Sequence, residues 1–165
     1  MTFNHLYPEP GQLPRAAIGS SLGKMRPQND EQQMTISNDL GDIATVMSAF
    51  EGFAKNCDVP ADIADRFNVV FDEMLSNIIY YGYPDDQRHE ISITFKHQDR
   101  CLNVTIKDDG IAFDPFGATS PNTALPVAER EIGGLGIHLV LNMMHEAHYR
   151  REGQHNIITL VQKLE

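Results

Sequence analysis

Cysteine is scarce in this sequence, and its scarcity excludes two ways of stabilising a small domain. Among the 165 residues the cysteines are Cys57 and Cys101, and neither belongs to a C-x-x-C pair. The spacing therefore suggests neither a disulfide framework nor a zinc site. We expect reduced thiols and a cytoplasmic location.

Long apolar runs and positive charge are scarce as well. No apolar stretch is long enough to span a bilayer, and the N-terminus lacks the charged-then-apolar pattern of a signal peptide, so no membrane partner is expected.

The formal net charge is −10, with 13 Lys and Arg against 23 Asp and Glu. Because a nucleic-acid backbone requires clustered Lys and Arg, we expect no direct nucleic-acid partner. A single bound nucleotide remains compatible with this charge, since backbone amides and a metal can hold it.

The chain divides into a tail and one domain. Residues 1–33 contain several prolines, glycines and serines and no sustained apolar period, which predicts a flexible N-terminal tail. Residues 34–165 carry the periodic patterns, and their number suits a single domain with its own core.

The order of predicted strands and helices indicates the fold class. Alternating patterns predict strands within residues 32–38, 89–97, 101–110 and 148–164, the last as a hairpin turning at 152–154. Helical patterns predict helices over 40–56, 60–81 and 133–147. Gly82 is expected as a left-handed C-cap, and Asp99–Arg100 as a hairpin turn. Because strands and helices do not alternate one for one, we expect an α/β protein of the α+β two-layer type, with a mixed, mostly antiparallel sheet and helices on one face.

Glu73 and Asn77 lie one turn apart in the second predicted helix. Residues spaced by four share one side of a helix, so the two form a polar strip beside its apolar face. The strip faces either water or a pocket. In a pocket, the carboxylate could accept a proton or orient a nucleophile, and the amide oxygen could ligate a hard cation such as Mg²⁺.

Asp108 and Gly110 follow the third predicted strand. The carboxylate could accept a hydrogen bond from an exocyclic amine such as that of adenine, and the glycine would let a flat ring approach the backbone. Ordinary turn residues explain the pattern equally well. A calcium loop starting at Asp108 is excluded, because Gly110, Ala112 and Thr119 occupy three of its ligand positions.

Glycines also open the last predicted helix, in the stretch "GGLGIHLV" from Gly133 to Val140. Free N–H groups at the positive end of a helix dipole favour a phosphate, although glycine at a helix start is often only a turn. The stretch is not a Rossmann fingerprint, because no strand immediately precedes it and the third glycine is absent. A Walker A loop is missing too.

Together, the E-x-x-x-N, D-x-G-x-A and G-x-G motifs, in this order and on these elements, resemble the GHKL ATP-binding superfamily, which includes DNA gyrase, histidine kinases and MutL. The likeness is closest to bacterial anti-sigma factor serine kinases of the RsbW and SpoIIAB type. It rests on "DEMLSNIIYYGY", "DDGIAFDP" and "GGLGIHLV" and covers roughly residues 33–165. The resemblance implies the Bergerat (GHKL) ATP-binding fold.

The resemblance also implies roles for the motif residues. Glu73 would act as general base or orient the attacking hydroxyl, and Asn77 would hold Mg²⁺ against the phosphates of ATP. Asp108 would read the adenine amine, with Gly110 allowing close approach.

Four further residues are implied as cofactor-binding. Gly134 and Gly136 would let the lid and the helix start wrap the phosphates. Ala112 stands where many superfamily members have glycine, and Thr159 matches in kind a threonine that helps the aspartate bind adenine. The loop over 111–132 is shorter than the lids of gyrase or histidine kinases.

The function implied by the resemblance is that of an anti-sigma factor serine-protein kinase. Its cofactors would be ATP and Mg²⁺. Its partners would be a sigma factor that it sequesters and a STAS-type anti-sigma factor antagonist that it phosphorylates on serine; a homodimer is compatible with this type. Two alternatives stay open: a non-catalytic ATP-binding regulatory module, and a detached histidine-kinase-type catalytic domain.

His145 lies in the last predicted helix and His148 directly follows it, so the two could pair on one helix face as metal ligands if the helix continued. No third ligand is spaced with them, so solvated or capping roles are favoured.

Overall fold

The computed structural model describes residues 29–117 and 134–164. Residues 1–28 of the predicted tail (1–33) and residues 118–132 of the predicted loop lie outside the described residues. The first strand begins at Asn29 and pairs with the second strand from there on. The sheet thus starts before the predicted domain boundary at residue 34, because polar residues extend the strand beyond the recognisable alternation.

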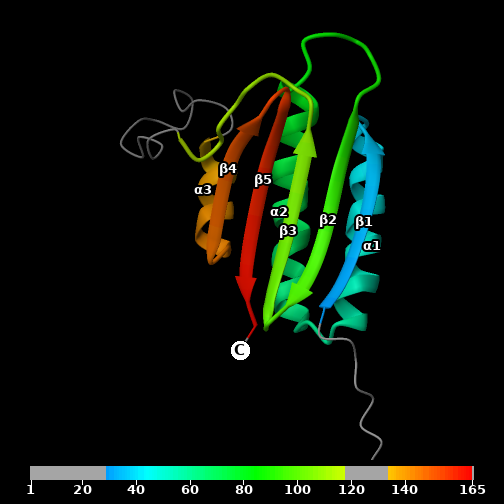
Figure 1. Cartoon of the computed structure of the whole chain (residues 1–165), viewed down its shortest axis with the longest axis vertical. Helices are drawn as coiled ribbons and strands as arrows, with labels where there is room; N and C mark the ends of the chain where they lie inside the picture. The colour runs from blue at the N-terminus through cyan, green and yellow to red at the C-terminus, as the bar shows by residue number, and fades with distance from the viewer. Residues whose placement is uncertain (1–28, 118–133, 165) are drawn as a thin grey trace, which may run out of the picture.

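Five strands form a single sheet (Figure 1). They are β1 (Asn29–Ser37), β2 (Glu90–Gln98), β3 (Cys101–Asp108), β4 (Glu146–Glu152) and β5 (His155–Lys163). Their order is β1-β2-β3-β5-β4. Every neighbouring pair is antiparallel, so the mostly antiparallel sheet is confirmed and contains no parallel pair among the described strands.

The helices lie together on one face of the sheet. They are η1 (Leu40–Asp42), α1 (Ile43–Asn56), α2 (Ala61–Tyr81) and α3 (Gly134–Met143). In Figure 1, α1 lies behind β1, α2 behind β3 and β5, and α3 behind β4. The predicted two-layer arrangement is therefore confirmed.

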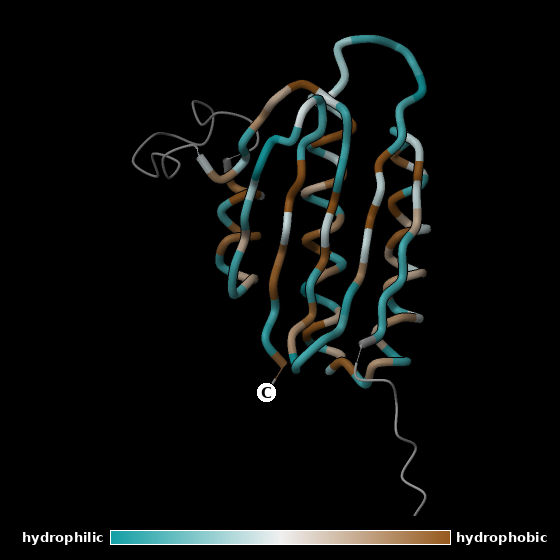
Figure 2. The backbone as a smooth tube through the Cα atoms, in the orientation of Figure 1, coloured by the Kyte–Doolittle hydropathy of each residue, from teal (hydrophilic) through white to brown (hydrophobic). Residues whose placement is uncertain are grey.

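Alternation along the strands decides which side chains face the helices. Successive side chains of a strand point to opposite faces, so every second residue enters the space between the layers. In β2 and β3 these residues are fully buried: Ile91, Ile93, Phe95, Leu102, Val104 and Ile106. In Figure 2 the central strands show more hydrophobic colour than the edge strands β1 and β4.

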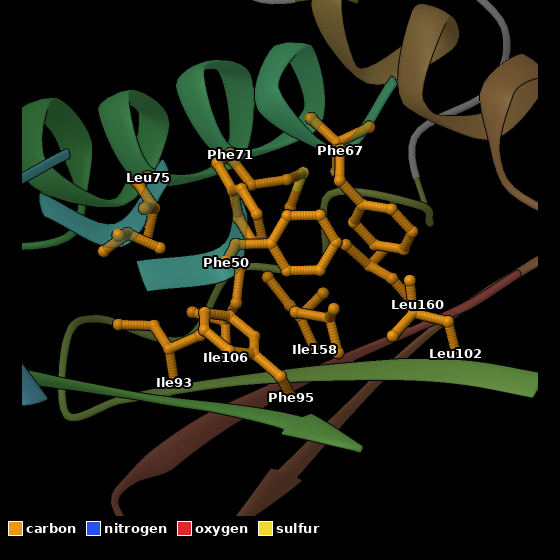
Figure 3. Close-up of a cluster of buried hydrophobic side chains, with 14 of the residues drawn as sticks. Phe50, Phe67, Phe71, Leu75, Ile93, Phe95, Leu102, Ile106, Ile158 and Leu160 are labelled. Carbon is orange, nitrogen blue, oxygen red and sulfur yellow. The ribbon is translucent and has the colours of Figure 1, made fainter. Parts of the chain in front are cut away.

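Phe50 lies at the centre of the core between the two layers (Figure 3). Its ring centroid is 5.0 Å from that of Phe67, 5.1 Å from that of Phe71 and 5.2 Å from that of Phe95. These partners come from α2 and β2, so one side chain of α1 joins both helices to the sheet. Such tilted and edge-on aromatic contacts add to the stabilisation that burial provides.

The last helix is shorter than predicted. It ends at Met143, and the chain enters β4 at Glu146, where residues alternate between exposed and half-buried positions opposite β5. His145 therefore precedes a strand and His148 lies within it. The predicted alternative in which the two histidines pair on one helix face is wrong, because they do not share a helix.

The expected left-handed cap at Gly82 is also wrong. Gly82 has φ −77° and ψ −26°, and its N–H donates to the carbonyl of Ile78 at 2.8 Å, which continues the helical pattern. The two-residue turn that the sequence predicts does have left-handed backbone, at Asp99 (φ 52°) and Arg100 (φ 60°).

Among the described residues, no helix combines the length and the apolar character that crossing a membrane requires.

Replacing Phe50 with alanine tests the importance of the aromatic junction. Because the side chain is fully buried among rings from α2 and β2, we expect Phe50→Ala to lower the free energy of unfolding by about 3–5 kcal/mol. Urea unfolding followed by circular dichroism measures this. Tyr80→Ala is the control, since that ring is 62% exposed, and its effect should stay within about 0.5 kcal/mol. Equal effects of the two substitutions would contradict the assignment.

Candidate functional site

Asp108 is a carboxylate in the helix-facing row of β3. It follows Leu102, Val104 and Ile106 at two-residue steps, so strand alternation directs it between the layers, and only 2% of it is exposed. A buried carboxylate requires hydrogen-bond donors, because desolvation disfavours its charged form. Asp108 is thus a buried polar group at the point where the apolar row ends.

Two donors hold one oxygen of this carboxylate. The Gly110 N–H and the Asn156 side-chain amide each donate to Asp108 Oδ1 at 2.8 Å. Burial raises the pKa of Asp108, and these two hydrogen bonds together with the nearby Arg151 charge offset part of that rise. Oδ2 has no hydrogen-bond partner within residues 29–117 and 134–164, so it can accept from a ligand.

Asn156 is itself fixed by side chains of β4. It is 5% exposed and pairs with Asp108 across β3 and β5. Its Oδ1 accepts from the Tyr149 hydroxyl at 2.9 Å and from Arg151 Nη1 at 2.7 Å. Both amide ends of Asn156 are therefore satisfied, and its NH₂ group is oriented toward Asp108.

The same side chains hold the backbone that follows β3. Arg151 Nη1 donates to the Gly110 carbonyl at 2.8 Å, and Asn156 Nδ2 donates to the Ile111 carbonyl at 2.9 Å. Three residues of the β4–β5 hairpin thus fix both the carboxylate and the glycine turn beside it.

Gly110 also contacts the end of α2. The Ile111 N–H donates to the Gly82 carbonyl at 2.8 Å. A Cβ at Gly110 would lie 2.7 Å from that carbonyl oxygen and 2.8 Å from Asp108 Oδ1. A side chain is excluded at this position because two backbones approach each other there.

At Gly136 the G-x-G motif contacts the E-x-x-x-N motif of α2. A Cβ at Gly136 would overlap the Glu73 carboxyl group, with Cδ at 2.5 Å. The half-buried Glu73 carboxylate consequently lies against the first turn of α3. Gly134 is the first residue of that helix, but its surroundings lie outside the described residues.

Asn77 lies one turn from Glu73 on α2 and is half-buried. Its Nδ2 atom is buried, and it has no hydrogen-bond partner among the described residues. A buried NH₂ group without a hydrogen-bond acceptor destabilises the fold unless a ligand supplies a partner. Rotation of the amide can present either its oxygen or its NH₂ group to that ligand. When the amide is rotated, its oxygen is a hard ligand, so Asn77 fits a hard cation such as Mg²⁺.

Thr159 does not join this site. It lies opposite Thr105 in β3, on the sheet face that carries no helices, whereas Asp108 and Asn156 face the helices. The expectation that Thr159 assists Asp108 was based on residue type, and the strand register corrects it. Asn156 makes the contact instead; counting alternation through the buried residues Ile158 and Leu160 would have indicated its orientation.

Ala112 follows the glycine turn and is exposed. No hydrogen bond joins it to the described residues of the site, so its part in cofactor binding stays a prediction.

His89 is a second group that the sequence does not indicate. Its ring stacks on Tyr83, with centroids 4.2 Å apart. Its Nε2 lies 2.8 Å from Asp85 Oδ1, and its Nδ1 lies 3.1 Å from Asp109 Oδ1. Hydrogen bonding to Asp85, with a smaller contribution from Asp109, raises the pKa of His89.

Tyr83, which stacks on this histidine, is close enough to the carboxylates at the end of β3 to be affected by their charge. Burial, and then the charges of Asp108 and Asp109, raise the pKa of the Tyr83 phenol. The segment between α2 and β2 is thus attached to the end of β3, directly beside Asp108.

Comparison with known proteins places these motifs in a family. The model of the histidine kinase-like ATPase domain matches residues 36–162. Curated relatives include the serine/threonine-protein kinase BtrW of Bordetella bronchiseptica, 33% identical over 89 residues. They also include the anti-sigma F factor of Oceanobacillus iheyensis, 25% identical over 96 residues, and the serine-protein kinase RsbW of Bacillus subtilis, 24% identical over 110 residues.

These matches cover part of each protein. They span 54% of this chain and 63% of BtrW, 58% of this chain and 66% of the anti-sigma F factor, and 63% of this chain and 68% of RsbW. For the first two relatives the match covers slightly less than two thirds of their length.

The surroundings of His89 predict a pH dependence of stability. Because the folded state raises the pKa of His89, the protonated ring stabilises the fold below its ordinary pKa of about 6.5. This contribution is lost as the pH rises through the raised value. We expect the melting temperature of the wild type, relative to that of His89→Gln, to decrease as the pH rises above about 6.5.

His148→Gln provides the control, since His148 is an exposed histidine that faces Glu146. Thermal melts of the three proteins across this pH range measure the effect. Parallel curves for the wild type and His89→Gln would show that the ring does not carry the dependence.

Proposed function

The chain belongs to the histidine kinase-like ATPase domain family, and on this premise we propose that it is an ATP- and Mg²⁺-dependent serine-protein kinase. One observation carries the proposal: a buried carboxylate, an orphaned amide and a helix start converge from three separate segments. Gly110 contacts the end of α2, and Gly136 contacts Glu73 in its middle. Each contact requires a glycine, so the geometry depends on the motif residues themselves.

Asp108 is proposed to recognise the base. Its Oδ1 is held by two donors, and Oδ2 is left to accept a hydrogen bond from the exocyclic amine of adenine. A base that presents a carbonyl there would leave a buried acceptor unpaired, which costs about 1–3 kcal/mol. Buried hydrogen-bonding groups of this kind give strong discrimination between related ligands.

Asn77 and the start of α3 are proposed to hold the phosphates. The Asn77 amide oxygen would ligate Mg²⁺, which supplies positive charge beside the phosphate oxygens. Around Gly136, the first turn of α3 offers backbone N–H groups at the positive end of a helix dipole. Together they favour a phosphate between α2 and α3.

Glu73 is proposed to act on the acceptor serine. In the transfer, the serine oxygen bonds to the γ-phosphorus while the bond to the β-phosphate oxygen breaks and ADP leaves. The serine proton passes to the Glu73 carboxylate, or the carboxylate orients the hydroxyl for attack. The close approach of Glu73 to Gly136, in the first turn of α3, supports this role.

The protein partners form the finer part of the proposal. One relative is named an anti-sigma F factor and two are named serine or serine/threonine kinases. By analogy, this chain would sequester a sigma factor and phosphorylate a serine of a STAS-type antagonist, so that the antagonist's phosphorylation state decides which partner is bound. The proposal is compatible with a homodimer.

Glu73→Gln tests the role in transfer. Glutamine keeps the shape against Gly136 but cannot accept the proton, so we expect ATP affinity to be retained and single-turnover transfer from γ-labelled ATP to fall about 10²–10⁴-fold. The acceptor is a STAS-type antagonist of the host, and acid-stable label identifies phosphoserine. Asp72→Asn, an exposed neighbour on α2, is the matched control. Transfer at wild-type rate in Glu73→Gln would refute the role, and acid-labile label would indicate histidine as the acceptor.

Asn77→Ala tests the cation site separately. Loss of a ligand to a charged group costs about 1.5–3 kcal/mol, so Mg²⁺-dependent ATP affinity should fall about 10- to 100-fold. Calorimetric titration with ATP, with and without Mg²⁺, measures this. Asn68→Ala on the same helix is the control and should leave the Mg²⁺ dependence unchanged. Unaltered affinity in Asn77→Ala would remove the amide from the proposed site.

A further inference from the structure

Three side chains with metal-binding groups meet at the end of the sheet remote from Asp108. They are Asp30 of β1, Cys57 just after α1, and His97 of β2. A carboxylate oxygen, the thiol sulfur and an imidazole nitrogen all lie within 4.8 Å of one another. No residue of this trio takes part in the proposed nucleotide site.

Strand register explains why two of the ligands meet. Asp30 and His97 are directly opposite each other in the β1–β2 pair. They share the helix-facing side with the buried Ile36 and Phe95, because the residues of each pair are an even number of positions apart. Both side chains are half-buried at the point where the apolar rows of the two strands end.

The end of α1 supplies the third ligand. Cys57 is the C-cap of that helix and is 8% exposed, and its N–H donates to the Phe53 carbonyl at 3.0 Å. Its Sγ lies 3.5 Å from Asp30 Oδ2, as a thiol that donates to a carboxylate. The sulfur is thus directed toward the strand pair by the helix that carries it.

We propose that Asp30, Cys57 and His97 form a site for a divalent transition-metal ion, with Zn²⁺ as the best match. Thiolate, imidazole and carboxylate are the ligand types that zinc takes in proteins, at bond lengths of about 2.0–2.3 Å. Ligand atoms in such a tetrahedron are about 3.3–3.8 Å apart. Side-chain rotations that move the ligand atoms by about 1 Å would therefore bring all three within bonding distance of one ion. The two half-exposed ligands leave a fourth position for water.

Charge and softness favour this class of ion over Mg²⁺ or Ca²⁺. A thiolate and a carboxylate together neutralise a divalent cation, and a sulfur ligand excludes the hard cations that require oxygen. Binding replaces the S–H bond of Cys57 with a sulfur–metal bond and releases the thiol proton to solvent, so affinity rises with pH.

The site would join the edge strand β1 to β2 and to the end of α1. Because the three ligands come from separate segments, an ion bound only by the folded state stabilises it. His97 pairs with Leu102, and Asp108 lies six positions further along β3, which corresponds to about 20 Å at 3.3 Å per residue. Metal binding here is therefore separable from nucleotide binding.

Cobalt provides the first test. The full chain, reduced and freed of metal with a chelator, is titrated with Co²⁺, and we expect one equivalent to produce a thiolate-to-cobalt charge-transfer band that Zn²⁺ then abolishes. In Cys57→Ser the band should be lost. Cys101→Ser is the matched control, because Cys101 lies on the sheet face opposite to that of His97, and it should keep the band.

Asp30→Asn and His97→Gln keep the test decisive even if Cys57→Ser folds poorly, since both replace half-exposed side chains. Each should weaken Zn²⁺ binding by at least about tenfold in competition with a chromogenic chelator. Zn²⁺ should raise the melting temperature of the wild type. Any rise that Mg²⁺ produces should be the same in the wild type and in Cys57→Ser. Absence of the cobalt band in the wild type, or its persistence in Cys57→Ser, would overturn the proposal.

Discussion

The buried carboxylate of Asp108 is the constraint on which the rest of the site depends. Burying it is unfavourable, as its raised pKa indicates, and the fold offsets this cost with the Gly110 N–H and the amide of Asn156. Tyr149 and Arg151 in turn orient Asn156. A hydrogen-bonded network of this kind has one satisfied arrangement, so the unpartnered oxygen is held in a defined direction for a ligand.

Close contacts at two glycines also fix the other two motifs relative to α2. Gly110 lies against Gly82 at the end of α2, and Gly136 lies against Glu73 in the middle of the same helix. Glu73 and Asn77 lie beside the apolar face of α2, where Phe67 and Phe71 pack on Phe50 and so position the helix. The aromatic core therefore positions the helix that contacts both Gly110 and Gly136.

Periodicity predicted most of the elements, because the burial of one face dictates a period of two or 3.6 residues. It failed where the outcome depends on partners far apart in the chain. Thr159 and Asn156 differ by three positions, an odd number, which reverses the sheet face, and residue type alone does not reveal that reversal. The end of α3 was misplaced because residues 146–152 pair with β5 instead of continuing a helix. Asp30, Cys57 and His97 share no spacing pattern; the register of β1 and β2 brings Asp30 opposite His97, and the end of α1 adds Cys57.

Both sites follow from one feature of the strands. In β3 the helix-facing row runs through Leu102, Val104 and Ile106 to Asp108, and in β2 it runs through Ile93 and Phe95 to His97. In an antiparallel pair these two row ends lie at opposite ends of the sheet. Each row turns polar where the helix layer stops filling the space above it, so an ionisable side chain there is partly shielded yet remains within reach of a ligand. The sheet thus has two chemically distinct ends, one built of oxygen and amide groups that fit a nucleotide and one that combines sulfur, nitrogen and oxygen and fits a transition metal.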